Sequence, residues 1–553
     1  MKHFRFVFAF VILGLTAGLS YGQIKLNVDA AVSNLLRYGN GYEYSGTSRY
    51  GKEYFENLTD ARLNVNGVIF GMRYDISDPR EYGRNFVGID KRYIEYKHDI
   101  GISLRAGDFY EIIGRGLSLN TFEDRQLAYD TGIDGARVIY QKTFGKKKSP
   151  MKVKAMVLAG DISYVDYLDL DREEKYKVRS AYGEFSPHKS ITFGLNYVYS
   201  TGDLPEQGDN TVVKTDLPEI GVNFNISDLQ IYASYAHKSS RVSPNSVYLT
   251  PITSLGDGFY SSVSYSAGDV GITLDYKNYR FDLTLPDNRS NTRPTRALPY
   301  QNPPTAQREH TSTLISRYPH VVDFNDEVGG QIDVVFAPTS EMTFTLNGSI
   351  ASRHYQYQDI DTGNNIAYQR IDRDDSYIPS LDNSYSPFWE FFIEGEYYIT
   401  PEIYTKLAFD RQSNTLYNQL NPQASEIIMT STIPVEFKYT FESINTLKLV
   451  FENQWVNNSI RIGDKTFNNR LVSLSYSRSP NISATVGVEF TDDEEEPTGK
   501  DSWYLAEVAY KINQSNTVNV SYGSERGGLR CTNGICRFVL PFQGFRLGIA
   551  TQF

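Results

Sequence analysis

After residue 22, the chain is built from short segments in which apolar and polar side chains alternate. In the segment 431–441, for example, Val435 and Phe437 share one face, while Glu436 and Lys438 share the other. Successive side chains of a β-strand point to opposite faces, so each such segment predicts a strand with one apolar and one polar face. No run with a convincing helical period interrupts this pattern, and the chain is therefore predicted to be all-β.

Two classes of connection alternate strictly between these segments. One class is short and rich in Gly, Pro, Asn, Asp and Ser, as at Asn66-Gly67 and Ser479-Pro480-Asn481, which is typical of hairpin turns. The other class is long and polar, and it covers about residues 40–56, 77–85, 111–130, 166–175, 202–215, 241–255, 284–325, 358–385, 414–428, 458–466 and 494–501. Short turns on one side and long loops on the other are typical of outer-membrane barrels.

Counting segments between the connections predicts a transmembrane antiparallel β-barrel of about 24 strands (22–24 expected), with short periplasmic turns and long extracellular loops. A bilayer offers no water to unpaired backbone groups, so a spanning sheet has to close on itself. The apolar faces then meet outer-membrane lipid and the polar faces line the lumen. At this width the wall side chains alone do not fill the lumen, which is therefore either wet or plugged.

The composition excludes several functional classes. The 42 Tyr and 31 Phe suit aromatic girdles at the two membrane interfaces. A net charge of −11 without a basic block argues against a nucleic-acid partner. Two Cys and seven scattered His offer little for a metal or cofactor site, and none is expected. No nucleophile–base motif ties Ser to His, so an enzyme is not expected either.

The first 22 residues are typical of a signal peptide. A basic start precedes an apolar core at residues 6–15, and the small residues Ser20 and Gly22 precede the predicted cleavage point. The alternative, a transmembrane anchor, is disfavoured because the apolar core falls short of the roughly 20 residues that span a bilayer. Residues 23–553 are then the exported barrel, and the bacterial outer membrane is the expected location.

The end of the chain resembles the C-terminal strand signal of outer-membrane barrels. Arg546, Gly548 and the final Phe553 match that signal, whereas Thr551 replaces its usual apolar residue. The resemblance implies that the outer-membrane assembly machinery recognises this strand.

A second resemblance covers residues 107–140. A strand ends in Leu104-Arg105-x-Gly107-x-Phe109, a long loop follows, and the next strand opens with Asp134-Gly135-x-Arg137-Val138. This segment resembles large substrate-selective porins. The Gly114-Arg115-Gly116-Leu117 and Glu123-Asp124-Arg125 motifs are more closely similar to an uncharacterised, porin-like outer-membrane family of Bacteroidota. In the porins, the loop between these strands folds into the barrel and narrows it.

The loop at 111–130 is the first candidate site. Its apolar residues, such as Ile113 and Leu117, are of little use on a surface, so we expect the loop to pack inside the barrel; an ordinary folded loop is the alternative. The predicted constriction residues are Glu111, Arg115, Glu123, Asp124, Arg125 and Asp130.

The strand pattern also predicts charged residues of both signs on the lumen wall, among them Arg105, Arg137, Glu394, Glu436 and Lys438. Such charges suit a water-filled pore, and they suit an interior closed by salt bridges equally well.

Residues 530–537 predict a hairpin with a disulfide. Asn533-Gly534 is the strongest signal for a type I′ turn, and it places Cys531 opposite Cys536 at a position where a disulfide can form. Export to an oxidising compartment favours that bond.

Two functions remain open from the sequence. The first is a porin-like channel for hydrophilic solutes, narrowed by the 111–130 loop. The second is a barrel subunit of a larger outer-membrane secretion, assembly or surface-protein complex, in which large loops such as 284–325 would bind envelope protein partners.

Overall fold

The computed structural model describes residues 27–146, 149–167, 169–205, 211–244, 249–281, 298–361, 366–373, 376–416 and 425–553. The predicted signal peptide lies outside these ranges. Within them, no helix is long and apolar enough to cross a membrane.

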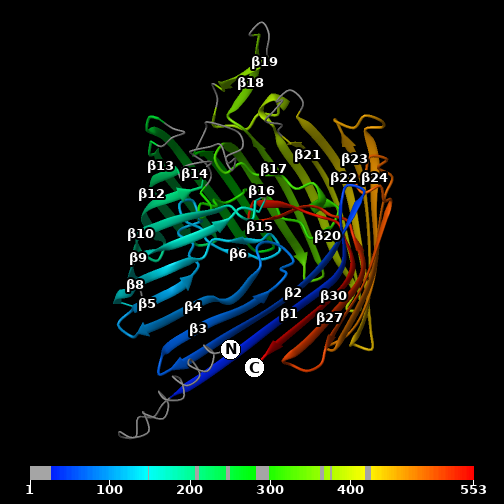
Figure 1. Ribbon diagram of the computed structural model, residues 1–553, viewed down its shortest axis with the longest axis horizontal. Helices are drawn as coiled ribbons and strands as arrows, with labels where there is room; N and C mark the ends of the chain where they lie inside the picture. Colours follow the sequence, from blue (N-terminus) through cyan, green and yellow to red (C-terminus); the bar gives the residue numbers. More distant parts are fainter. Residues whose placement is uncertain are drawn as a thin grey trace.

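In the described part of the chain, 24 strands form one antiparallel sheet that closes into a barrel (Figure 1). This confirms the predicted fold class. Each strand pairs with its neighbours in chain order. The wall strands are β1 (Val28–Ser45), β2 (Ser48–Val65), β3 (Val68–Ser77), β4 (Phe86–His98), β5 (Ile102–Phe109), β8 (Ile133–Lys146), β9 (Ser149–Val165), β10 (Glu173–His188), β11 (Ile191–Leu204), β12 (Thr211–Ile226), β13 (Leu229–Val242), β14 (Ile252–Ala267), β15 (Val270–Arg280), β16 (Glu327–Thr339), β17 (Met342–Ser352), β20 (Phe388–Thr400), β21 (Ile403–Leu416), β22 (Glu426–Phe441), β23 (Asn445–Asn458), β24 (Thr466–Arg478), β25 (Ile482–Thr491), β26 (Ser502–Lys511), β27 (Asn516–Glu525) and β30 (Phe542–Gln552).

Smaller elements lie in the connections of the described chain. They are the strand pairs β6 (Glu123–Asp124) with β7 (Tyr129–Asp130), β18 (Tyr355–Asp361) with β19 (Ile366–Asp372) and β28 (Gly528–Thr532) with β29 (Ile535–Val539), and the 3-10 helices η2 (Ile315–Arg317) and η3 (Asn383–Tyr385).

The two faces of the wall carry the chemistry that the alternation predicts. In β23, Phe451 and Trp455 point outward and are 42% and 49% exposed, whereas Glu452 and Gln454 face the lumen and are 3% and 0% exposed. An apolar outer face, with backbone groups paired from strand to strand around the cylinder, meets the requirements of a bilayer. The protein is therefore a β-barrel of the bacterial outer membrane.

Short turns lie at one end of the barrel and long connections at the other, and β1 begins and β30 ends at the short-turn end (Figure 1). One expected long connection, at 40–56, is wrong. Strand β1 continues to Ser45 and β2 starts at Ser48, with a turn at Gly46, whose φ is 57°. The polar residues in this stretch belong to strands that continue beyond the expected membrane boundary, because a strand in water needs no apolar face.

Three connections of the described chain fold from the long-loop end into the lumen. They are residues 110–132 between β5 and β8 (the first insert), residues 298–326 before β16 (the second insert), and residues 526–541 between β27 and β30 (the third insert). The second insert covers most of the stretch expected to bind partners at the surface, and Tyr300 and Leu314 within it are 0% exposed. That expectation does not hold for residues 298–325.

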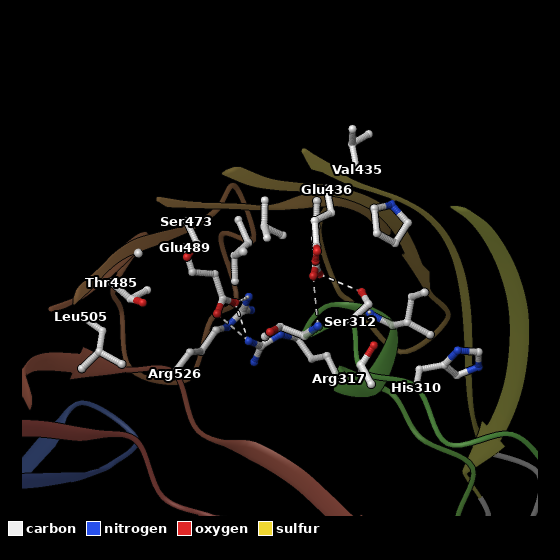
Figure 2. A pocket seen from close by; sticks show the side chains of 18 of the residues that line it. His310, Ser312, Arg317, Val435, Glu436, Ser473, Thr485, Glu489, Leu505 and Arg526 are labelled. Atoms are coloured by element: carbon white, nitrogen blue, oxygen red, sulfur yellow. Dashed lines mark hydrogen bonds and ion pairs between the residues drawn. The ribbon is translucent and has the colours of Figure 1, made fainter. Parts of the chain in front are cut away.

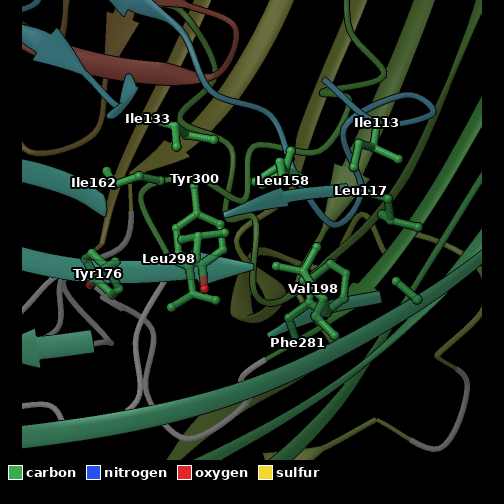
Figure 3. Close-up of a cluster of buried hydrophobic side chains, with 14 of the residues drawn as sticks. Ile113, Leu117, Ile133, Leu158, Ile162, Tyr176, Val198, Phe281, Leu298 and Tyr300 are labelled. Carbon is green, nitrogen blue, oxygen red and sulfur yellow. The ribbon is translucent and has the colours of Figure 1, made fainter. Parts of the chain in front are cut away.

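The largest apolar core lies where the inserts meet the inner wall (Figure 3). Ile113 and Leu117 of the first insert and Tyr300 of the second belong to one cluster with Leu158 of β9 and Val198 of β11. Each of these five side chains is at most 4% exposed. The largest apolar core is thus inside the barrel, and it fixes the first and second inserts against one half of the wall.

Candidate functional site

The first insert leaves the wall at Phe109 and returns at Ile133, two residues that face each other across β5 and β8. Both of its ends are therefore held by paired strands. Between them, Leu117 and Leu119 are 0% exposed and belong to the apolar core on the inner wall. That this segment narrows a channel stays a prediction.

Arg125 attaches the first insert to the wall. Its guanidinium lies 3.1 Å from the carboxylate of Asp75 and 3.7 Å from that of Glu56, which are 0% and 2% exposed. Arg80 and Arg37 approach the same two carboxylates at 2.7 and 2.9 Å. Three guanidinium groups thus share two buried carboxylates, and Arg125 is the one that the insert contributes.

The other charged residues of the first insert differ in their surroundings. Four have partners: Glu111 pairs with Arg137, Glu123 with Arg73 at 2.7 Å, Asp130 with Lys91 at 2.5 Å, and Asp124 accepts hydrogen bonds from the backbone N–H groups of Gln126 and Leu127. Arg115 is exposed, and its guanidinium lies 5.1 Å from the centre of the Tyr232 ring. Of the six predicted constriction residues, Arg115 is the exposed one, whereas the other five are partly buried.

The predicted lumen-wall residues lie in pairs of opposite charge. The pairs are Arg105 with Glu95 at 3.1 Å, Arg137 with Glu111, Glu394 with Lys406 at 3.4 Å, and Glu436 with Lys438 at 2.9 Å. The wall therefore presents both signs close together rather than a field of one sign.

The second insert crosses the lumen between distant parts of the wall. On one side, the Tyr300 hydroxyl donates to Ser200 of β11. On the other, the backbone N–H of Leu314 donates to Glu452 of β23 at 2.7 Å, and Gln454 donates back to the Leu314 carbonyl at 2.6 Å. These contacts hold the second insert across the lumen, between β11 and β23.

Asp323 is a buried acid near the end of the second insert. Burial raises the pKa of this carboxyl to about 7, although the Arg353 guanidinium at 3.9 Å acts in the opposite direction. The neighbouring carboxylates of Asp326 and Glu327 raise the pKa further.

The third insert is the hairpin β28–β29. Its turn residues Asn533 and Gly534 have φ values of 50° and 75°, as a type I′ turn requires. Cys531 and Cys536 are paired residues and form a disulfide, with Cα atoms 4.1 Å apart. A Cβ on Gly534 would lie 2.4 Å from the ring of Phe324, so the tip of the hairpin packs directly on the second insert.

Two cavities lie on the short-turn side of the inserts. The larger has a volume of about 640 Å³. Its wall residues include Lys406 and Lys448, each close to the short-turn end of its strand. Ser312 and Arg317 of the second insert border it on the opposite side (Figure 2). The smaller, about 350 Å³, lies beneath the first insert and includes Arg115. We call these the large and the small inner cavity.

A third cavity, about 440 Å³, lies on the long-loop side and is bordered by residues at the strand tops, including Tyr44 and Leu416. We call it the outer pocket. Two residues, Arg317 and Arg526, line both the outer pocket and the large inner cavity. They form a partition between the two spaces.

The partition is an ion-paired cluster. Glu489 of β25 contacts both guanidinium groups, at 2.6 Å from Arg317 and 3.1 Å from Arg526 (Figure 2). Arg526 also pairs with Glu496 at 2.6 Å, and it lies 4.8 Å from the centre of the Trp503 ring. All four charged side chains are at most 10% exposed. Burial lowers the pKa of the Arg317 guanidinium, and Glu489 raises it in part.

These partition residues were not among the sites predicted from the sequence. The available signal was Arg526-Gly527-Gly528 directly after a strand, where two glycines permit the chain to leave the wall. Nothing local marks Arg317, which belongs to a stretch that the sequence assigned to the surface.

Comparisons with known proteins identify the family and a broad likeness in shape. Residues 47–553 match a family of unknown function (DUF6029), whereas no curated protein matches the chain. The expected assignment to Bacteroidota stays a prediction.

Among solved structures, three similar ones are the siderophore receptor PirA from Pseudomonas aeruginosa (6% identity, TM-score 0.45), the FrpB iron transporter from Neisseria meningitidis (9%, 0.40) and the copper transporter OprC (11%, 0.41). The matches cover 95% of this chain and 80%, 82% and 80% of those chains, respectively. At these scores the likeness carries no argument about what this barrel binds.

Proposed function

The chain belongs to the DUF6029 family, whose function is unknown, and from the geometry of its lumen we propose that it is an outer-membrane channel for small hydrophilic solutes. The channel is narrowed by segments of its own chain. The 111–130 loop is one of these segments, and the partition at Arg317 and Arg526 is the narrow point.

This proposal rests on the observation that the same two side chains border the spaces on both sides of the partition. Because Arg317 and Arg526 border both the outer pocket and the large inner cavity, a solute that moves between these two spaces passes these two side chains. The partition consists of side chains rather than of strand backbone. We therefore expect its width to change when the two arginines rotate and their ion pairs with Glu489 and Glu496 break, while the wall strands stay paired.

The charges along this route favour polar solutes over apolar ones. The large inner cavity includes Glu436, Glu507 and Glu489 together with Lys406 and Arg530. Opposed charges at a narrow point in a medium of low dielectric order water and discriminate among solutes by charge more strongly than an open wall does.

Conductance across planar bilayers tests the proposal. In Arg526→Ala, we expect a larger single-channel conductance and a shift of ion preference toward cations, because Glu489 and Glu496 lose a shared counter-charge. Arg530→Ala is the matched control, because it removes a positive charge from the lining of the large inner cavity but not from the partition; its effect on conductance and selectivity should be smaller. Unchanged conductance and selectivity in Arg526→Ala would contradict the route.

A subunit role in an envelope complex is the second candidate. It is favoured by an apolar patch near η3, on the long-loop side, where Tyr377, Ile378 and Leu381 are 74%, 64% and 63% exposed. A barrel that is silent in bilayers, in the native form and in Arg526→Ala alike, would favour this role. Under either role, we propose that the assembly machinery recognises the C-terminal strand β30.

A further inference from the structure

Three side chains that can ligate a metal meet where the second insert touches the wall. They are His310 of the insert, Glu390 of β20 and Asp410 of β21. One ligand atom of each lies within 4.8 Å of the others. The imidazole Nε2 of His310 is 2.7 Å from a carboxylate oxygen of Glu390.

The two carboxyl groups are buried and incompletely satisfied. Asp410 is 0% exposed and Glu390 5%. Among the described residues, no N–H group or hydroxyl donates a hydrogen bond to either side-chain oxygen of Asp410 or to the second oxygen of Glu390. A buried carboxylate without a partner costs several kcal/mol, so this arrangement calls for a species that neutralises it.

The surrounding side chains do not supply the missing charge. Arg308 of the insert pairs with Asp333 at 2.8 Å, and Lys406 of β21 pairs with Glu394 at 3.4 Å. The residues paired with Glu390 and Asp410 on the neighbouring strands β17 and β22 are Ser349 and Thr432, which are neutral.

The charge within the cluster is likewise unbalanced. The cluster contains two carboxyl groups and one imidazole, so its acidic groups outnumber its basic group.

We propose that His310, Glu390 and Asp410 bind a divalent transition-metal ion, with Zn²⁺ as the best match. Ca²⁺ and Mg²⁺ prefer oxygen ligands alone, whereas an imidazole with two carboxylates suits Zn²⁺ and its neighbours. Zinc bonds of about 2.0–2.2 Å place ligand atoms roughly 3.3 Å apart in a tetrahedral site. Binding of the ion replaces the hydrogen bond between His310 and Glu390. Their ligand atoms separate by about 0.6 Å, and ligand atoms that are now up to 4.8 Å apart move closer by as much as about 1.5 Å.

The bound ion would join the second insert to the barrel wall, since His310 belongs to one and both carboxylates to the other. His310 also lines the large inner cavity, which gives the ion a path from the short-turn side. This site does not depend on the channel proposal, because binding is measured without transport.

Calorimetric titration of the chelator-treated full-length barrel in detergent with ZnCl₂ tests the proposal. We expect one equivalent to bind, and both His310→Ala and Asp410→Asn to weaken binding by more than about 10-fold, the loss that even outer-shell changes produce. His98→Ala is the control, because His98 lies at the β4–β5 turn and leaves the site intact. Heat-modifiable mobility on gels establishes that each variant is folded.

Two results would overturn the site. One is the absence of zinc binding to the native chain, in which case Glu390 and Asp410 share a proton instead. The other is binding that both variants leave unchanged. If the variants do not fold, X-ray absorption of the zinc-loaded native protein decides the question, since the site requires a shell of one imidazole with oxygen ligands. A shell with sulfur or with several imidazoles would overturn it.

Discussion

Arg125→Gln is expected to loosen the first insert. Arg125 is 20% exposed, and its partners Asp75 and Glu56 are almost fully buried. Removal of one member of a buried ion pair costs about 3–5 kcal/mol. Here Arg80 still pairs with Asp75 and Arg37 with Glu56, so we expect a cost below this range, about 2 kcal/mol. This corresponds to roughly a 30-fold change in the equilibrium between the docked and the undocked first insert.

Arg115→Gln is the matched control on the same insert. Arg115 is exposed and contacts the Tyr232 ring at 5.1 Å, an interaction worth about 0.5–1 kcal/mol at an exposed site. The same substitution there should change the docking equilibrium only a few-fold.

Hydrogen exchange of the backbone amides of residues 110–132 measures this equilibrium, because local opening exposes them to solvent. In Arg125→Gln, exchange should be roughly 30-fold faster than in the native protein, and in Arg115→Gln only a few-fold faster. Equal acceleration in both variants, or none in Arg125→Gln, would refute the argument that the buried carboxylates hold the insert in place.

Two further predictions concern the wall and the second insert. Leu449 lies four residues from the short-turn end of β23, roughly 10 Å into an apolar belt about 25 Å tall, so Leu449→Arg should reduce the free energy of unfolding in lipid vesicles by about 2–4 kcal/mol. Val450 faces the large inner cavity, and Val450→Arg should therefore reduce the free energy of unfolding far less. Equal losses in the two variants would contradict the assignment of faces. The pKa of Asp323 is raised from 3.8 to about 7, so between these pH values the folded state binds more protons than the unfolded state. The stability of the folded state therefore falls by up to about 4 kcal/mol as the pH rises from 4 to 7. The backbone amides of residues 318–326 should exchange faster at pH 8 than at pH 5 after correction for the intrinsic rates, and Asp323→Asn should remove that difference.

The wall of the barrel was predictable because its determinants are local. Whether Phe451 or Glu452 meets lipid depends only on the period of two within one strand. The turn at Asn533 and Gly534 is likewise set by two residues whose backbone tolerates positive φ. The error at 40–56 arose because polar side chains mark contact with water, and both a loop and an extended strand above the bilayer have such contact.

The partition was not predictable because its members meet from distant parts of the chain. Arg317 and Glu489 are 172 residues apart in sequence, and their pairing depends on where each insert lands on a wall that the sequence describes only strand by strand. The second insert was assigned to the surface for a related reason. A polar lumen accepts the same mixed composition as water, so composition does not distinguish a loop that folds inward from one that stays outside.

The seam between β1 and β30 sets an order of assembly. Tyr44 of β1 donates a hydrogen bond to Gln543 of β30, 499 residues later in the sequence. One edge of β1 therefore stays unpaired until β30 pairs with it. Pairings between such distant segments form late in folding. The third insert directly precedes that closing strand and carries Arg526. Both earlier inserts and every wall strand except β30 precede Arg526 in the chain. The barrier that Arg526 shares with Arg317 therefore needs nearly the whole chain, but not the strand that closes the cylinder.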